Sequence, residues 1–219
     1  MKTIPIFNSS VQFPIAKIFC VGKNYLEHAK EMGRKIPSSP VIFLKPATAL
    51  HHGTAPIQIP SVSKIVHHEV ELVIAIGRGG KNIPEPNAAD YIFGYAVGLD
   101  MTLRDIQSEA KKEGLPWTLA KGFDTSAPVS QIIPKLNAPT SDFEICCRVN
   151  GQEKQRTFTS QMIFSPAQLI SYISFFFTIE EGDLIFTGTP AGVSAVQHND
   201  VVEAELVGYT AICHQVLFQ

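Results

Sequence analysis

The stretch HHEVELVIAI, residues 67–76, decides the fold, because it joins two acidic side chains to an unbroken apolar run. The run from Leu72 to Ile76 is apolar and largely β-branched, which is typical of a strand buried in a core. Residues two apart in a strand share a face, so Glu69 and Glu71 project together with Cβ atoms about 6–7 Å apart. The stretch therefore predicts a buried strand with two carboxylates on one face, at the boundary of the core.

Two like charges at a core boundary repel each other. Glu69 and Glu71 are tolerated there if one is protonated, if a cation pairs them, or if both remain in water. A solvent-facing strand edge with ordinary acidic residues explains this segment alone equally well. The choice between these explanations needs a further acidic group.

That group is Asp100, which ends the apolar stretch GYAVGLD, residues 94–100. An Asp at such a place is commonly a helix N-cap, but Thr102 can cap the helix expected over residues 102–113. Three carboxylates from two strands suit a hard cation such as Mg²⁺, which prefers about six oxygen ligands and keeps several for water or substrate. His67 and His68 raise zinc as an alternative. However, His68 shares its face with Val70, which favours a structural histidine.

Short strands dominate the rest of the chain. With 219 residues, 45% of them hydrophobic, and no linker or internal repeat, one domain over residues 1–219 is expected. Helices are too few for regular β-α alternation, which favours a mixed β (α+β) class. Candidate strands span residues 17–21, 41–45, 68–76, 94–99, 143–149, 184–187, 201–206 and 210–217. Candidate helices run from Asn24, as cap, to Gly33, over residues 102–113, and over residues 166–176.

Composition also bears on partners. The net charge is −2, and Lys and Arg do not cluster, which argues against nucleic-acid and anionic-membrane surfaces. The longest apolar run, around residues 169–179, is shorter than the roughly 20 residues of a membrane-spanning helix. No signal peptide is recognisable, and the four cysteines form no C-x-x-C pair. We expect a cytoplasmic protein with a small-molecule partner.

Six ordered stretches together resemble the fumarylacetoacetate hydrolase family, most of all its small acylpyruvase and oxaloacetate decarboxylase branch. They are VGKNY (21–25), PVIFLKP (40–46), HHEVE (67–71), GYAVGLD (94–100), KGFD (121–124) and TGTP (187–190). The resemblance implies a β-sandwich roll with a few short helices, and a homodimer. It also implies Mg²⁺ or Mn²⁺ held by Glu69, Glu71 and Asp100, with Ca²⁺ as a non-catalytic occupant.

The resemblance further implies roles around the metal. His28 and Glu31, in a lid over residues 24–32, would form a water-activating pair; without the resemblance a solvated surface pair is the simpler explanation. Lys121 and Gln107 would stabilise an oxyanion, and Thr189 would bind substrate oxygens. Arg104 is a weaker substrate-binding candidate, because a salt bridge to a neighbour explains it equally well.

The implied activity is hydrolysis of the C–C bond of 2,4-dioxo acids, such as fumarylpyruvate or acetylpyruvate, to pyruvate and a carboxylic acid. Oxaloacetate decarboxylation and keto–enol tautomerisation use the same enolate and stay open, as does a catalytically inactive metal-binding β protein. The chain departs from its relatives at Ser194-Ala195, where they carry Gly-Pro, at Asn199, where Gly is usual, and at Lys23. The identity of the acid is therefore the least transferable part of the resemblance.

Overall fold

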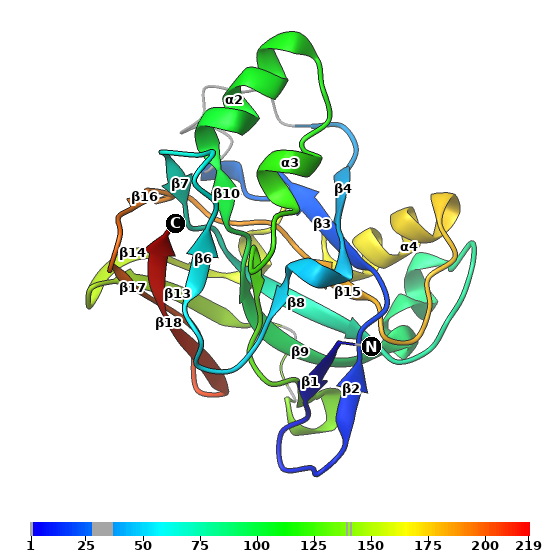
Figure 1. Cartoon of the computed structure of the whole chain (residues 1–219). Helices are drawn as coiled ribbons and strands as arrows, with labels where there is room; N and C mark the ends of the chain where they lie inside the picture. Colours follow the sequence, from blue (N-terminus) through cyan, green and yellow to red (C-terminus); the bar gives the residue numbers. More distant parts are fainter. Residues whose placement is uncertain (1, 28–36, 139, 141) are drawn as a thin grey trace.

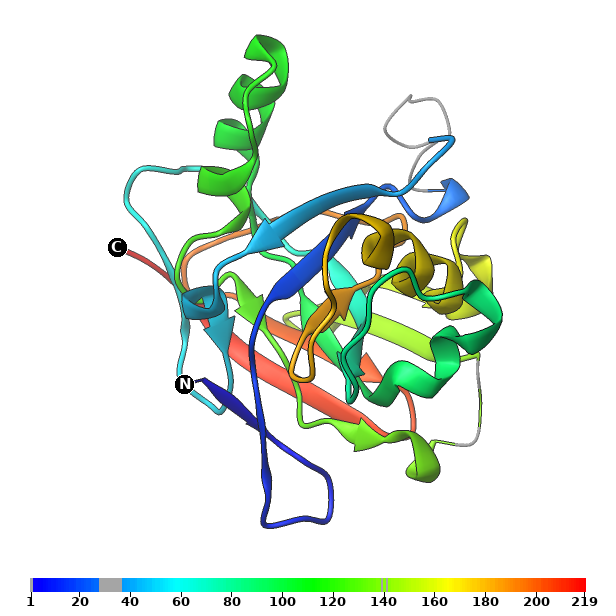
Figure 2. The ribbon, with the colours of Figure 1, turned by 90° about the vertical axis from the view of Figure 1, so that its right-hand side faces the viewer.

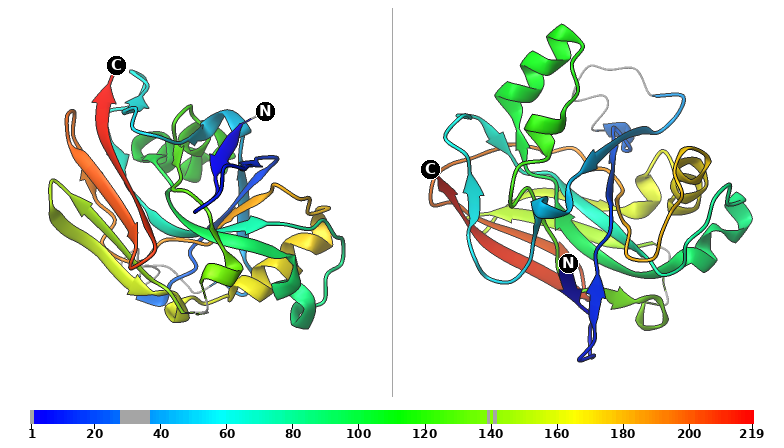
Figure 3. Two further views of the ribbon diagram at one scale, coloured as in Figure 1. Left: turned by 90° about the horizontal axis from the view of Figure 1, so that it is seen from below. Right: turned by 45° about the vertical axis from the view of Figure 1, so that its right-hand side comes forward.

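Two β-sheets form the framework of the molecule in the computed structural model, which describes residues 2–27, 37–138, 140 and 142–219. The six-stranded sheet has the order β12-β9-β8-β15-β3-β4 and the five-stranded sheet the order β14-β13-β17-β18-β6. Seen from below, the two sheets lie against each other, with the helices beyond the six-stranded sheet (Figure 3). The expected mixed β class with a few short helices is confirmed.

The strands of the six-stranded sheet are β12 (Ile133–Pro134), β9 (Ile92–Leu99), β8 (Val70–Ile76), β15 (Leu184–Phe186), β3 (Ile18–Gly22) and β4 (Val41–Lys45). Those of the five-stranded sheet are β14 (Gln152–Phe158), β13 (Glu144–Val149), β17 (Val201–Leu206), β18 (Thr210–Phe218) and β6 (Ile57–Ile59). The smaller sheets use β1 (Thr3–Pro5), β2 (Gln12–Pro14), β5 (Leu50–His51), β7 (Val66–His67), β10 (Thr102–Leu103), β11 (Ala127–Pro128) and β16 (Ala195–Val196).

Helices are short and lie at the rim of the sheets. The α-helices are α2 (Arg104–Glu113), α3 (Thr118–Lys121) and α4 (Pro166–Phe176). The 3₁₀ helices are η1 (Ala47–Ala49), η2 (Glu85–Tyr91), η3 (Lys135–Asn137) and η4 (Thr159–Gln161). Turned by 90°, the ribbon shows α2 projecting from one end, while α4 and η2 pack together on the side (Figure 2).

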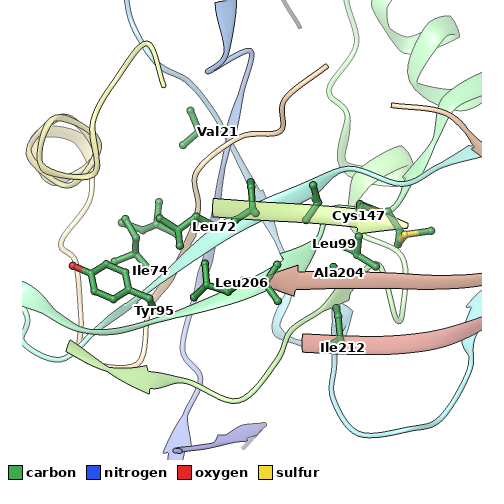
Figure 4. Close-up of a cluster of buried hydrophobic side chains, with 14 of the residues drawn as sticks. Val21, Leu72, Ile74, Tyr95, Leu99, Cys147, Ala204, Leu206 and Ile212 are labelled. Atoms are coloured by element: carbon green, nitrogen blue, oxygen red, sulfur yellow. The ribbon is translucent and has the colours of Figure 1, made fainter. Parts of the chain in front are cut away.

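Both faces of the central strand β8 are buried, which explains its continuous apolar sequence. Leu72 and Ile74 enter the larger core between the two sheets, where they meet side chains such as Leu206 of β17 (Figure 4). Val73 and Ala75 enter a second core on the opposite face. Glu71 shares the face of Val73 and Ala75, so its carboxylate extends that second layer and points away from the sandwich interior.

Two expected helix caps are wrong. Thr102 lies in β10 and donates its hydroxyl to Asp100 O at 3.1 Å, and Leu103 precedes α2 without a side-chain cap. The side chain of Asn24 contacts the Phe164 backbone and Thr187 O, because it ties two distant loops together. Gly114 does end α2 in the left-handed conformation, with φ 71°.

Candidate functional site

Three buried carboxylates converge where β8 and β9 meet. The antiparallel register pairs Val70 with Leu99 and Glu71 with Gly98, and Asp100 N–H donates to Glu69 O at 2.8 Å. Glu69 and Asp100 therefore face each other across the ladder, on the same side as Glu71. One ligand oxygen from each of the three lies within 4.8 Å of the others. The three residues are 6%, 2% and 1% exposed for Glu69, Glu71 and Asp100, so burial makes any unbalanced charge costly.

Two of these carboxylates are paired with basic side chains. Lys121 Nζ lies 2.7 Å from Glu69 Oε2 and 2.5 Å from Asp100 Oδ2, while Arg104 also binds Glu69. Burial opposes ionisation of Glu69, but Lys121 and Arg104 outweigh it and hold its pKa well below the usual range. Burial likewise opposes the charge of Lys121, and the carboxylates of Asp100 and Glu69 outweigh it and raise the pKa of Lys121. Both groups are therefore charged at neutral pH.

Glu71 is the carboxylate without such a partner. Its Oε2 accepts the Gly188 N–H at 2.7 Å, and within the described part of the chain no basic side chain forms an ion pair with it. Burial, followed by repulsion from Asp100 and Glu69, raises the pKa of Glu71 well above its usual value. Glu71 therefore takes up a proton at neutral pH unless a cation arrives.

Asp100 also keeps an oxygen for a cation. Lys45 Nζ is 2.9 Å from Asp100 Oδ1, close enough for charge attraction. However, its three hydrogens are directed to Lys121 O, Ser126 O and Ser126 Oγ, and Oδ1 accepts no hydrogen bond in the described part of the chain. An all-oxygen donor set with an unused buried oxygen and an uncompensated glutamate fits a hard divalent cation.

The carboxylates form the floor of a cavity with a strongly polar lining. Its wall includes Gly22, Lys23, Arg104, Gln107, Lys111, Lys121 and Thr189, with the apolar residues Val21, Phe43 and Trp117. Gln107 is 3% exposed, and its Oε1 accepts from Arg104 Nη1 at 2.6 Å and from Lys111 Nζ at 2.8 Å. Since its oxygen is occupied, Gln107 has its amide hydrogens left to donate.

The structure thus brings together seven of the residues that the sequence analysis selected, from four parts of the chain: Glu69, Glu71, Asp100, Arg104, Gln107, Lys121 and Thr189. His28 and Glu31 lie outside the described residues. Arg104 is more central than expected, because it binds Glu69. His68 makes no contact with the carboxylates and is hydrogen bonded to Gln155 and Ser194, as expected of a structural histidine.

Sequence reasoning missed Lys45 and Gln155. Lys45 ends the apolar strand β4, and a lysine inside such a run signals a buried partner of opposite charge. Gln155 is the buried residue of the polar strand β14, and the sequence carries no signal for it.

Comparison with known proteins follows from this geometry. Residues 17–217 match the model of the fumarylacetoacetate (FAA) hydrolase C-terminal family. The chain belongs to the fumarylacetoacetate hydrolase family. The resemblance drawn from the six sequence stretches is confirmed.

Several members of the family are similar over nearly their whole length. The mitochondrial oxaloacetate tautomerase of Rattus norvegicus is 50% identical over 200 residues, which cover 91% of this chain and 90% of the relative. The mitochondrial oxaloacetate decarboxylase of Dictyostelium discoideum is 50% identical over 88% of this chain and 89% of its own. The crystal structure of fumarylpyruvate hydrolase from Pseudomonas aeruginosa with Mn²⁺ and pyruvate superposes with a TM-score of 0.96, at 38% identity, covering 100% and 96% of the two chains.

Proposed function

We propose that this protein is a Mg²⁺- or Mn²⁺-dependent enzyme that forms the enolate of a short 2-oxo acid, and that oxaloacetate is its first candidate substrate. The observation that carries the proposal is the convergence of Glu69, Glu71 and Asp100 within 4.8 Å, buried at the floor of a cavity with basic walls. The reactions would be keto–enol tautomerisation and loss of CO₂, which share this enolate.

The three carboxylates would hold the cation, which would supply Lewis-acid polarisation of the substrate's oxygens. Lys121 is charged, 3% exposed and beside Glu69 and Asp100, so it places a fixed positive charge where an enolate oxygen develops. Gln107 adds amide hydrogens at the same wall. Both groups are held by hydrogen bonds before a substrate arrives, which lowers the cost of reorganisation during the reaction.

Oxaloacetate is favoured by the charge of the cavity and by the relatives. Lys23, Arg104, Lys111 and Lys121 all line it, which suits a substrate with two carboxylates. The tautomerase of Rattus norvegicus and the decarboxylase of Dictyostelium discoideum are each 50% identical to this chain, against 38% for the fumarylpyruvate hydrolase.

Acylpyruvate hydrolysis, the first expectation from the sequence, is the second candidate. The near-complete superposition with fumarylpyruvate hydrolase, whose structure contains Mn²⁺ and pyruvate, supports it. Hydrolysis also needs a base that takes a proton from water, and Glu31 assisted by His28 is proposed for that step. A metal-binding protein without turnover is the outcome if no substrate reacts.

Assembly and location stay predictions. A homodimer of a single-domain chain is expected, and light scattering after size exclusion tests it. In the part of the chain that the structure describes, no helix is long and apolar enough to cross a bilayer. Several relatives are named mitochondrial, so the cytoplasmic location expected from the sequence is tested by fractionation.

The deciding experiment is a substrate panel. Oxaloacetate, fumarylpyruvate and acetylpyruvate are each mixed with the protein and Mg²⁺ or Mn²⁺, and then with EDTA. Enol absorbance, CO₂ release and pyruvate formation are followed separately. Metal-dependent enol exchange or CO₂ release from oxaloacetate supports the first candidate, and cleavage of an acylpyruvate the second. Absence of metal-dependent turnover of all three substrates refutes both.

A further inference from the structure

The cavity residue Thr189 is backed by a buried polar network centred on Gln155. Gln155 is 1% exposed and reaches from β14 of the five-stranded sheet to the end of β8. Its Oε1 accepts the Val70 N–H at 3.0 Å and lies 3.0 Å from His68 Nδ1. Its Nε2 donates to Thr189 Oγ1 at 2.8 Å and to Pro190 O at 2.9 Å. All four contacts of this amide are therefore made inside the protein.

Two backbone groups fix the direction of every bond in this network. The Val70 N–H can only donate, so its partner on Gln155 is the oxygen, and the Pro190 carbonyl can only accept, so its partner is the nitrogen. Both hydrogens of Gln155 Nε2 are then used, one of them by Thr189. Thr189 Oγ1 is consequently the acceptor in this contact.

This direction determines what Thr189 presents to the cavity. A hydroxyl has one hydrogen, and the Gln155 contact uses an oxygen lone pair rather than that hydrogen. Among the residues that the structure describes, none accepts the Thr189 hydroxyl hydrogen. Thr189 is 4% exposed and lines the cavity beside the carboxylates. Its hydrogen is therefore left for an oxygen of the ligand.

A second branch braces Gln155 from behind. Because Gln155 Oε1 is an acceptor, His68 carries its hydrogen on Nδ1, and His68 Nε2 then accepts from Ser194 Oγ at 2.8 Å. Ser194 stands where related sequences carry glycine, so this last bond is a feature of the present chain. It holds the imidazole, and through it the amide of Gln155, in one orientation.

We propose that Gln155 is a positioning residue that makes the Thr189 hydroxyl an obligate hydrogen-bond donor toward the substrate. The position then favours a ligand oxygen that carries negative charge, such as a carboxylate or enolate, and disfavours a group that presents N–H or O–H. That the ligand is a 2-oxo acid rests on the proposed function, whereas the direction of the Thr189 hydroxyl rests on the network alone.

The Gln155→Glu variant tests the proposal, because it keeps an oxygen for Val70 and His68 but replaces the donating nitrogen by an acceptor. The Thr189 hydroxyl then turns to the new carboxylate and is lost to the ligand. We expect the affinity of the Mn²⁺-loaded protein for pyruvate and oxalate to fall about tenfold in calorimetry, as in Thr189→Val, with Mn²⁺ affinity unchanged. Thr189→Ser should bind like wild type.

The double variant separates positioning from simple charge repulsion. If Gln155 acts through Thr189, Gln155→Glu together with Thr189→Val binds no more weakly than Thr189→Val alone. Additive losses would mean that the new charge repels the ligand directly, and would overturn the proposal. Gln152→Glu, the same change on an exposed part of β14, is the matched control and should bind pyruvate like wild type.

Two further measurements keep the test decisive. If Gln155→Glu does not fold, Gln155→Met is used in the same cycle, where the Thr189→Val loss should again fail to add. A neutron structure of the metal-free wild type reads the hydroxyl itself: deuterium on Thr189 Oγ1 pointing away from Gln155 is expected, and deuterium pointing at Gln155 overturns the proposal. This result is independent of the substrate, so it stays separate from a failure of the oxaloacetate assay.

Discussion

Replacing Glu71 by Gln should stabilise the metal-free protein and weaken its response to metal. The wild-type carboxylate is 2% exposed, repelled by Asp100 and Glu69, and neutral in the fold at pH 7, whereas in the unfolded chain it is ionised. Taking up a proton at pH 7 by a group with an ordinary pKa of 4.5 costs about 2.5 × 1.36, or about 3.4 kcal/mol. Gln carries no such cost and keeps an oxygen for the Gly188 N–H.

The sign of the pH dependence follows from the raised pKa. The folded wild type binds a proton that the unfolded chain has lost, so wild-type stability rises as the pH falls toward 4.5. In EDTA, Glu71→Gln should therefore exceed wild type by about 2–3 kcal/mol at pH 7, and the advantage should vanish near pH 4.5. Urea unfolding followed by circular dichroism over this pH range measures both values.

Metal should reverse the order. Mg²⁺ or Mn²⁺ binding to the ionised Glu71 removes its penalty, so added metal should raise the melting temperature of wild type more than that of Glu71→Gln. Glu181→Gln, at an exposed turn, is the control and should show no pH-dependent difference. A Glu71→Gln variant no more stable than wild type in EDTA at pH 7, or equally favoured at pH 4.5, would refute the reasoning.

Three other changes probe the same region. Lys45→Met should lower the free energy of unfolding by about 3–5 kcal/mol in urea titrations, because it leaves the buried Asp100 without its neighbouring charge; a loss below 1 kcal/mol would contradict that pairing. Gly188→Ala should cost about 1–3 kcal/mol, because φ is +100° and the added Cβ would lie 2.7 Å from Asn24 Cβ; unchanged melting would count against it. Glu31→Gln should abolish acylpyruvate hydrolysis with Mg²⁺ affinity intact by calorimetry, and wild-type hydrolysis rates would remove Glu31 as the base.

Periodicity carried the sequence analysis where a strand is long and its burial uniform. The strands β4 and β17 and the helix α4 have the expected bounds, and β8 and β9 differ by two residues at one end. The polar strand β14 was not expected, because an edge strand with alternating exposure and few apolar residues does not differ in sequence from a loop.

The sequence by itself determined the chemistry of this protein's site. Glu69 and Glu71 share a face through the two-residue period of a strand, and Asp100 ends the next buried strand, so all three were identified without coordinates. Their meeting was decided by tertiary structure, since the antiparallel register that sets Glu69 opposite Asp100 depends on two strands packing side by side.

The positions of Lys45, Lys121 and Gln155 also belong to the tertiary structure alone. Each is placed by a different element, β4, α3 and β14, and each bonds to groups far away in the chain. A local pattern reports which face a residue occupies but not which distant group lies opposite that face. Burial then fixes the partners, because a buried charge or amide is stable when its hydrogen bonds are made inside the protein.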